Sequence, residues 1–132
     1  MAQGDMFASA DVAKAFDAIP ADCHSVLLAL RRLIYQVAIE CPEVGRVEEW
    51  GQPAYLTSET KSGTTVRLGQ ARDGRAAIFT HCQTSVVSEF RQIFPEAFEY
   101  DGTRAVLLGD LGDAKLEKLA FLMQSALTYH LR

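Results

Sequence analysis

The sequence predicts an α+β protein with elements in the order ααβββαββα and an antiparallel sheet covered by helices on one face. Apolar residues recur at helical spacing near both ends of the chain, and short runs rich in Val, Thr, Tyr and Ile occupy the middle. Ser-Gly and Asp-Gly pairs separate those runs. With 132 residues, of which 48% are hydrophobic, the chain is long enough to form one domain, which we assign to residues 1–132.

Two helices are expected in the first third of the chain. The first covers about residues 9–19, with Ser9 as its N-cap and Pro20 after its end. The second covers about residues 22–41 and is amphipathic along its whole length. Its apolar face consists of Val26, Leu27, Leu30, Leu33, Ile34, Val37, Ala38 and Cys41. This face predicts that the second helix lies over the core.

The middle of the chain changes to the pattern of β-strands. Three short strands fit this stretch, at about residues 47–56, 64–69 and 76–82. The second and third strands should pair as an antiparallel hairpin, because a short loop containing Asp73-Gly74 joins them. A third helix is expected next, with Thr84 or Ser85 as its cap and Pro95 after its end.

The last third of the chain predicts a hairpin followed by a helix. Two strands, at about residues 97–100 and 103–108, flank Asp101-Gly102, a pair typical of two-residue hairpin turns. The final helix begins at Asp113, and its apolar face continues in register as far as His130. A histidine at this place is typical of a structural residue near a helix end, where the helix dipole favours a protonated imidazole.

Composition excludes two classes of partner. The formal net charge of −4 comes from 17 acidic and 13 basic residues that are spread evenly, so no basic patch for nucleic acid is expected. No apolar stretch approaches the roughly 20 residues that cross a bilayer, so no membrane is expected either. Residues 1–8 lack the features of a secretory signal, and the three cysteines are odd in number and widely spaced. We therefore expect a cytoplasmic protein with reduced thiols.

Five short blocks follow one another along the chain: WGQPAY at 50–55, GTTVR at 63–67, FTHCQT at 79–84, YDGTRA at 100–105 and ALTYH at 126–130. In this order and spacing they resemble the YdhG-like family of uncharacterised proteins. The resemblance implies an α+β fold, and some members of the wider family are described as intracellular iron chaperones that resemble frataxin. Glu49 departs from the pattern, because similar members often carry a basic residue at that position.

A candidate ligand-binding site follows from strand alternation. If Val66 and Leu68 face the helices, Arg67 emerges on the opposite face of the sheet. There an aromatic wall with guanidinium donors would suit a carboxylate, a phosphate or a planar ligand. The residues assigned to this site are Trp50, Tyr55, Arg67, Arg104 and His81. The alternative is purely structural, with the arginines stacked on the aromatic rings and paired with surface carboxylates.

Two other kinds of chemistry have weaker support in the sequence. His81 and Cys82 are adjacent, but neighbouring strand residues point to opposite faces, so Cys82 is expected to be a structural thiol. No spacing typical of a zinc site is present. Iron could bind to an acidic patch, and the candidates, all expected to be exposed, are Glu40, Glu43, Glu48 and Glu49.

The sequence thus favours a non-catalytic binding module for a small anionic or planar ligand or a protein partner. A frataxin-like iron chaperone is the first alternative, with iron as the only cofactor it would need. An enzyme of unknown reaction is the second, because no arrangement of nucleophile, base and oxyanion donors is recognisable. A homo-oligomer is compatible with each of the three hypotheses.

Overall fold

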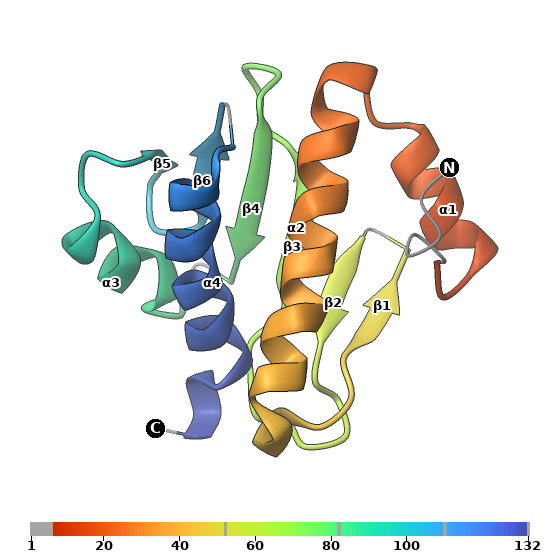
Figure 1. Cartoon of the computed structure of the whole chain (residues 1–132), viewed down its shortest axis with the longest axis vertical. Helices are drawn as coiled ribbons and strands as arrows, with labels where there is room; N and C mark the ends of the chain where they lie inside the picture. Colours follow the sequence, from red (N-terminus) through yellow and green to blue (C-terminus); the bar gives the residue numbers. More distant parts are fainter. Residues whose placement is uncertain (1–6, 52, 82, 110, 132) are drawn as a thin grey trace.

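The computed structural model describes residues 7–51, 53–81, 83–109 and 111–131. Within these residues the strands form one antiparallel sheet in the order β1-β2-β3-β4-β6-β5 (Figure 1). The strands are β1 (Glu48–Trp50), β2 (Ala54–Leu56), β3 (Val66–Gln70), β4 (Ala76–Thr80), β5 (Glu99–Asp101) and β6 (Ala105–Leu108). The α+β class predicted from the sequence is confirmed.

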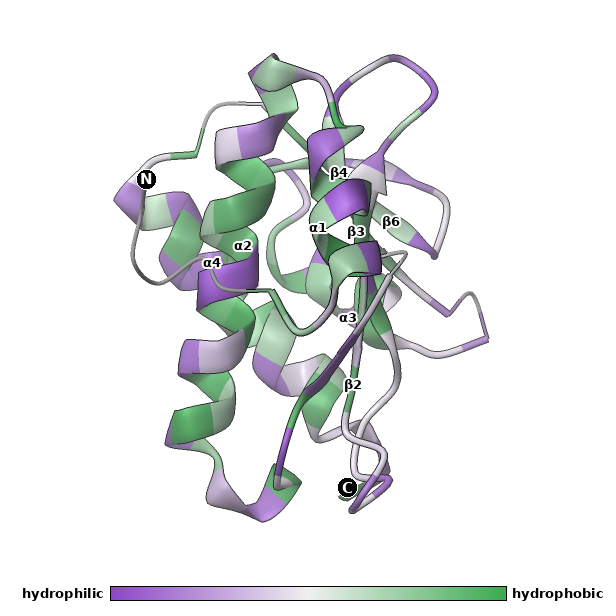
Figure 2. Ribbon diagram, turned by 90° about the vertical axis from the view of Figure 1, so that its right-hand side faces the viewer, coloured by the Kyte–Doolittle hydropathy of each residue, from purple (hydrophilic) through white to green (hydrophobic). Residues whose placement is uncertain are grey.

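Two long helices lie side by side over one face of the sheet (Figures 1 and 2). They are α2 and α4, which contact each other, while α1 lies near β1 and α3 packs against α4. The helices are α1 (Ala10–Asp17), α2 (Ala21–Glu40), α3 (Val86–Ile93) and α4 (Asp113–Leu127). Short 3-10 turns, η1 (Pro42–Val44) and η2 (Tyr129–Leu131), follow α2 and α4. The sheet is thus covered by α2 and α4 on what we call its helix face.

Some helix ends agree with the caps predicted from the sequence and others do not. The Ser9 hydroxyl accepts a hydrogen bond from the Val12 N–H, which is the expected N-cap of α1. Ser85 precedes α3 but does not cap it with its side chain, because its hydroxyl donates to the Glu89 carboxylate instead. His130 was expected on the apolar face of the last helix, but α4 ends at Leu127 and His130 is exposed in η2.

Two strand boundaries differ from the prediction. The run predicted as one strand at 47–56 is a tight hairpin, in which Trp50 pairs with Ala54 across the turn, so the sheet has one strand more than expected. Gly51 and Pro53 flank that turn, and both residues disfavour a continuous strand. The β5–β6 connection has three residues rather than two, because Asp101 pairs with Ala105. Gly102, with φ +58, supplies the left-handed backbone of this loop.

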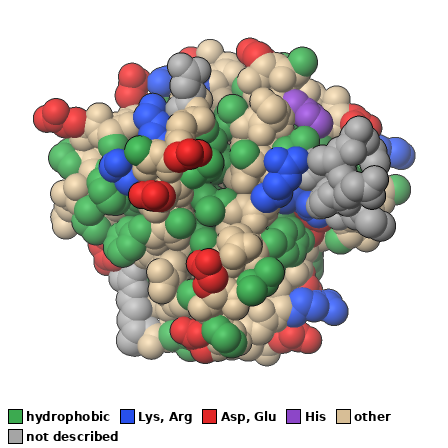
Figure 3. Space-filling model, viewed as in Figure 1, with side chains coloured by type: hydrophobic (Ala, Val, Ile, Leu, Met, Phe, Trp, Pro, Cys, Tyr) green, Lys and Arg blue, Asp and Glu red, His purple; other side chains and the backbone are tan. Residues whose placement is uncertain are grey.

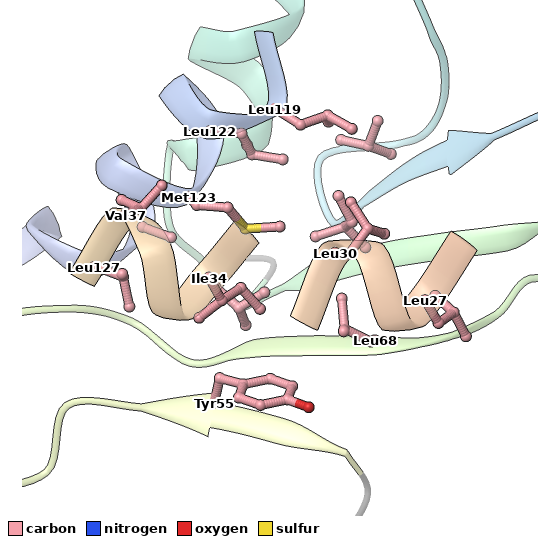
Figure 4. Close-up of a cluster of buried hydrophobic side chains, with 14 of the residues drawn as sticks. Leu27, Leu30, Ile34, Val37, Tyr55, Leu68, Leu119, Leu122, Met123 and Leu127 are labelled. Atoms are coloured by element: carbon pink, nitrogen blue, oxygen red, sulfur yellow. The ribbon is translucent and has the colours of Figure 1, made fainter. Parts of the chain in front are cut away.

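The core fills the space between the helix face of the sheet and the helices α2 and α4. Leucine, isoleucine and methionine side chains from the two helices meet above β3 and β2 (Figure 4). Side chains fully removed from solvent at this place include Leu27, Leu30, Ile34, Leu68, Leu119, Leu122 and Met123. The apolar face predicted for the second helix is confirmed at its central positions.

The C-terminal end of α4 is held by the loop before β3. The Thr64 N–H donates to the Ala126 carbonyl at 2.9 Å, and the Ser62 hydroxyl donates to the Leu127 carbonyl at 3.0 Å. Gly63 lies between these contacts, and a Cβ atom there would stand 2.6 Å or less from both carbonyl oxygens. Only glycine therefore allows the loop and helix backbones to approach this closely.

We expect Gly63→Ala to lower the free energy of unfolding by about 1 to 3 kcal/mol, because the loop or α4 must shift to remove the overlap. Gly109→Ala is the matched control, since a Cβ atom at Gly109 meets nothing within 4 Å. Urea denaturation of the two variants measures the difference. Equal stabilities would show that the loop moves away from α4 at no cost.

Candidate functional site

The candidate site lies on the open face of the sheet, which we define as the face turned away from α2 and α4. Side chains alternate along β3, so Val66 and Leu68 are buried in the core and Arg67 is exposed on the open face, as predicted. Strand register sets Arg67 in one row across the sheet. The row reads Trp50, Ala54, Arg67, Phe79, Ala105 and Asp101.

Arg67 is the central cation of this face. Its guanidinium carbon lies 4.3 Å from the centroid of the Phe79 ring, so the two groups are stacked. The Arg67 guanidinium has no hydrogen bond or ion pair with any described residue. The five N–H donors of the guanidinium are therefore not occupied by a described carboxylate, while stacking on Phe79 limits the motion of the group.

Trp50 supplies an exposed aromatic surface at the edge of the same row. Its side chain is 57% exposed, and its indole N–H donates to the Glu48 carboxylate at 3.2 Å. Two strand spacings, about 10 Å, separate the backbones of Trp50 and Arg67, with Ala54 between them. The open face thus offers two separate contact points.

Tyr55 does not lie on this face, so the structure does not bring it together with Trp50 and Arg67. Tyr55 is opposite Glu49 in the β1–β2 hairpin, and both side chains are buried on the helix face. The Tyr55 hydroxyl donates to the Glu49 carboxylate at 2.6 Å. The turn between β1 and β2 sets this register, and alternation then separates Tyr55 from Trp50.

Arg104 and His81 lie at one end of the sheet, next to the row of Arg67 but outside it. The Arg104 carbonyl accepts a hydrogen bond from the Thr80 N–H, which brings the β5–β6 loop beside the end of β4. The Arg104 guanidinium pairs loosely with Asp101 at 3.7 Å. His81 is exposed, and its Nδ1 accepts the Gln83 N–H at 3.1 Å.

A buried ion pair that the sequence did not predict lies on the helix face. The Arg31 guanidinium of α2 donates to both oxygens of the Glu49 carboxylate, and Ala8 N–H adds a third donor at 3.0 Å. The rings of Phe7 and Tyr35 lie 4.8 and 5.2 Å from the Arg31 guanidinium carbon. The prediction that Glu49 is an exposed carboxylate is therefore wrong, because its charge is compensated inside the protein.

The ionisation of this cluster follows from its contacts. Burial raises the pKa of Glu49, but hydrogen bonds from Arg31, Tyr55 and the Ala8 N–H more than offset this, so the pKa lies below its usual range. The pKa of Tyr55 is raised by burial and by its hydrogen bond to Glu49. At neutral pH the pair is thus Arg31⁺ and Glu49⁻ with a neutral Tyr55. The sequence does not indicate that Arg31 is buried. Its position next to Leu30 on the apolar face of the helix is the only hint.

The other acidic residues proposed for iron do not gather around Glu49. Glu40 is exposed and accepts a hydrogen bond from the Gln36 amide, and Glu48 pairs with Arg46 at 3.3 Å. In the described part of the chain, no group of three or more His, Cys, Asp and Glu side chains could hold a metal ion. On the helix side of the molecule, acidic and basic side chains are intermixed with hydrophobic ones (Figure 3).

Two cysteines are placed by the structure. Cys23 and Cys41 are free thiols in the core, and burial raises the pKa of both. Cys82 lies outside the described residues. The Cys23 thiol donates to the Gly74 carbonyl at 3.3 Å, at the floor of a hollow of about 650 Å³ between the start of α2 and the β3–β4 loop. The nearby guanidinium of Arg75 is paired with Asp73 and Glu99, so it offers less to an anion than Arg67 does.

No helix among residues 7–51, 53–81, 83–109 and 111–131 is both long and apolar enough to cross a membrane. Comparison of the chain with protein-family models, with curated proteins and with solved structures found no match.

Proposed function

We propose that this protein is a non-catalytic binding module whose open face recognises a molecule that carries a carboxylate or another planar anion. The observation that carries the proposal is the state of Arg67, which is exposed, stacked on Phe79 and without an ion pair to a described residue. Arginine left in this state on a protein surface is suited to bidentate contact with an anion.

Physical chemistry favours an anion at this place over other ligands. Carboxylates and guanidinium groups are planar and form two parallel hydrogen bonds, a geometry that lysine does not reproduce. The contact with the Phe79 ring restricts the guanidinium, so less side-chain entropy is lost on binding. Exposed Trp50 adds apolar area, and tryptophan and arginine are the residue types that most often dominate the energetics of interfaces.

The proposal requires binding only. Neither Trp50 nor Arg67 acts as a nucleophile or as a base near neutral pH, whereas both contribute contact area and hydrogen bonds. The sheet surface between them suits a flat or extended partner. A closed pocket that excludes water, as catalysis needs, is a different kind of site.

Arg67→Ala is expected to abolish binding of a planar carboxylate and to change the free energy of unfolding by less than about 1 kcal/mol, because an exposed stacked cation contributes little to stability. Benzoate is the probe and sodium chloride at equal ionic strength is its control. Amide chemical shifts in ¹⁵N-labelled protein should move at Arg67, Gly69 and Phe79 on titration with benzoate.

The matched control variant is Arg72→Ala, which removes an exposed arginine from the β3–β4 loop. It should bind benzoate as the unmodified protein does. Shifts that persist in Arg67→Ala, or that map to the helix face, would contradict the proposed site. A strongly destabilised Arg67→Ala variant with unchanged binding would identify Arg67 as a structural residue.

A further inference from the structure

On the part of the open face formed by β3, β4, β6 and β5, the side chains are arranged so that two copies placed face to face would complement each other. Two neighbouring rows cross the four strands β3, β4, β6 and β5 on this side of the sheet. The first row reads Arg67, Phe79, Ala105 and Asp101, and the second reads Gly69, Ala77, Leu107 and Glu99. In each row, one of the two residues that pair across the β4–β6 boundary is large and the other is small: Phe79 pairs with Ala105, and Leu107 pairs with Ala77.

A two-fold axis parallel to the strands and above the β4–β6 boundary would pack two copies face to face. This operation lays β3 of one copy over β5 of the other, and β4 over β6, with the strands of the two sheets aligned. Because the axis is parallel to the strands, each row of one copy lies opposite the same row of the other copy. The contact is isologous, so every pairing that it makes occurs twice.

The apolar residues of the two rows are complementary in size under this symmetry. Phe79 of one copy would face Ala105 of the other, and Leu107 would face Ala77. Phe79 and Leu107 are partly exposed, whereas Ala77 and Ala105 are completely buried. The exposed parts of Phe79 and Leu107 would therefore be covered by the facing sheet, as side chains are between sheets packed about 10 Å apart.

The charges are complementary in the same arrangement. Arg67 of one copy would face Asp101 of the other, and the same pair forms again across the axis. Among the described residues the Asp101 carboxylate has only the 3.7 Å contact to the Arg104 guanidinium, whereas the Glu99 carboxylate is paired with Arg75 at 3.1 Å. Arg67, which has no ion pair to a described residue, would thus meet a weakly paired carboxylate, and this contact fixes the register of the two copies.

We propose that the partner recognised by this face is a second copy of the chain, joined through β3, β4, β6 and β5 with Arg67 bound to Asp101 of the other copy. The inference rests on the proposed function, because the second copy supplies the carboxylate. Strands β1 and β2 lie beyond the contact, so Trp50 stays outside the interface between the copies.

Sedimentation equilibrium at concentrations on the order of 1 to 100 μM, which span the range of micromolar Kd values, tests the dimer. The unmodified protein should show twice the 14.5 kDa of one chain. Arg67→Asp and Asp101→Arg should each be monomeric, because like charges then meet twice across the axis, and the double variant should be dimeric again. Arg72→Asp, a charge reversal on the β3–β4 loop, should leave the dimer unchanged.

Circular dichroism establishes that each variant is folded. If the double variant does not fold, Leu107→Lys tests the same interface, because it puts a charge opposite Ala77 near the axis and should give a monomer. A monomeric unmodified protein overturns the inference, as does a dimer that survives Arg67→Asp or a folded double variant that stays monomeric.

The two proposals fail in distinguishable ways. Asp101→Arg keeps Arg67 and removes the carboxylate of the second copy that competes with benzoate, so this variant should bind benzoate more tightly than the unmodified protein does. A monomeric unmodified protein whose Asp101→Arg variant binds benzoate at Arg67 overturns the dimer and leaves the proposed binding face standing. Absence of both the dimer and benzoate binding overturns both proposals.

Discussion

Glu49→Ala is expected to lower the free energy of unfolding by about 3 to 5 kcal/mol, because it removes the carboxylate that compensates the buried charge of Arg31. Arg31 is 5% exposed and donates to both carboxylate oxygens of Glu49. Tyr55 loses its acceptor in the same variant, which adds an unsatisfied hydroxyl. Urea denaturation at neutral pH measures the loss.

The matched control is Glu48→Ala, one residue earlier on the same strand, whose carboxylate pairs with exposed Arg46. Its effect should be much smaller, since exposed ion pairs contribute little. The double variant Arg31→Met with Glu49→Leu should be more stable than Glu49→Ala, because it leaves no buried charge. A Glu49→Ala variant as stable as Glu48→Ala would contradict the buried ion pair.

The pH dependence of stability provides a second readout of Glu49. Its folded-state pKa is below the usual value, so the stabilisation is fully present above the unfolded-state pKa and is lost as pH falls through the folded-state pKa. The difference in stability between the unmodified protein and Glu49→Gln should therefore shrink on acidification from about pH 7 to pH 3. If the difference in stability grew on acidification instead, folding would raise the pKa of Glu49 rather than lower it.

Ile34→Ala is expected to cost about 2 to 5 kcal/mol, because it removes buried methyl groups and leaves a cavity between α2 and the sheet. Ile34 is completely buried, close to Leu30, Met123 and Tyr55 (Figure 4). Ile39→Ala is the matched control, since Ile39 is on the same helix and is 73% exposed. Its change should stay within about 0.5 kcal/mol.

Thermal and urea unfolding of these two variants should therefore separate them clearly. Equal losses at Ile34 and Ile39 would mean that the buried face of α2 has been misidentified.

The sequence predicted the elements because their signals are local. The period of apolar residues placed α2 and its buried face, and alternation along β3 placed Arg67 opposite Val66 and Leu68. The ends of the strands are predicted less accurately where a single short turn determines them. A single strand was predicted at 47–56, whereas the turn around Gly51 and Pro53 makes a hairpin of it.

The errors at the site have a local and a distant origin. Alternation along a strand over 47–56 already separates Trp50 from Tyr55, and the register of β1 against β2 places Tyr55 beside Glu49 on the helix face. Arg31 is 18 residues from Glu49 and becomes its partner only when α2 lies over the sheet. The stacking of Arg67 on Phe79 likewise needs the β3–β4 register.

The position of β6 between β4 and β5 has a consequence for how the chain folds. Strands β1 to β4 follow one another as neighbours, and β5 and β6 form a hairpin of their own, so both parts can begin to form from local contacts. Joining them pairs Ala76 with Leu108 across a connection that contains α3, and this costs more loop-closure entropy than either hairpin. We therefore expect the β4–β6 pairing to form after the two parts that it joins.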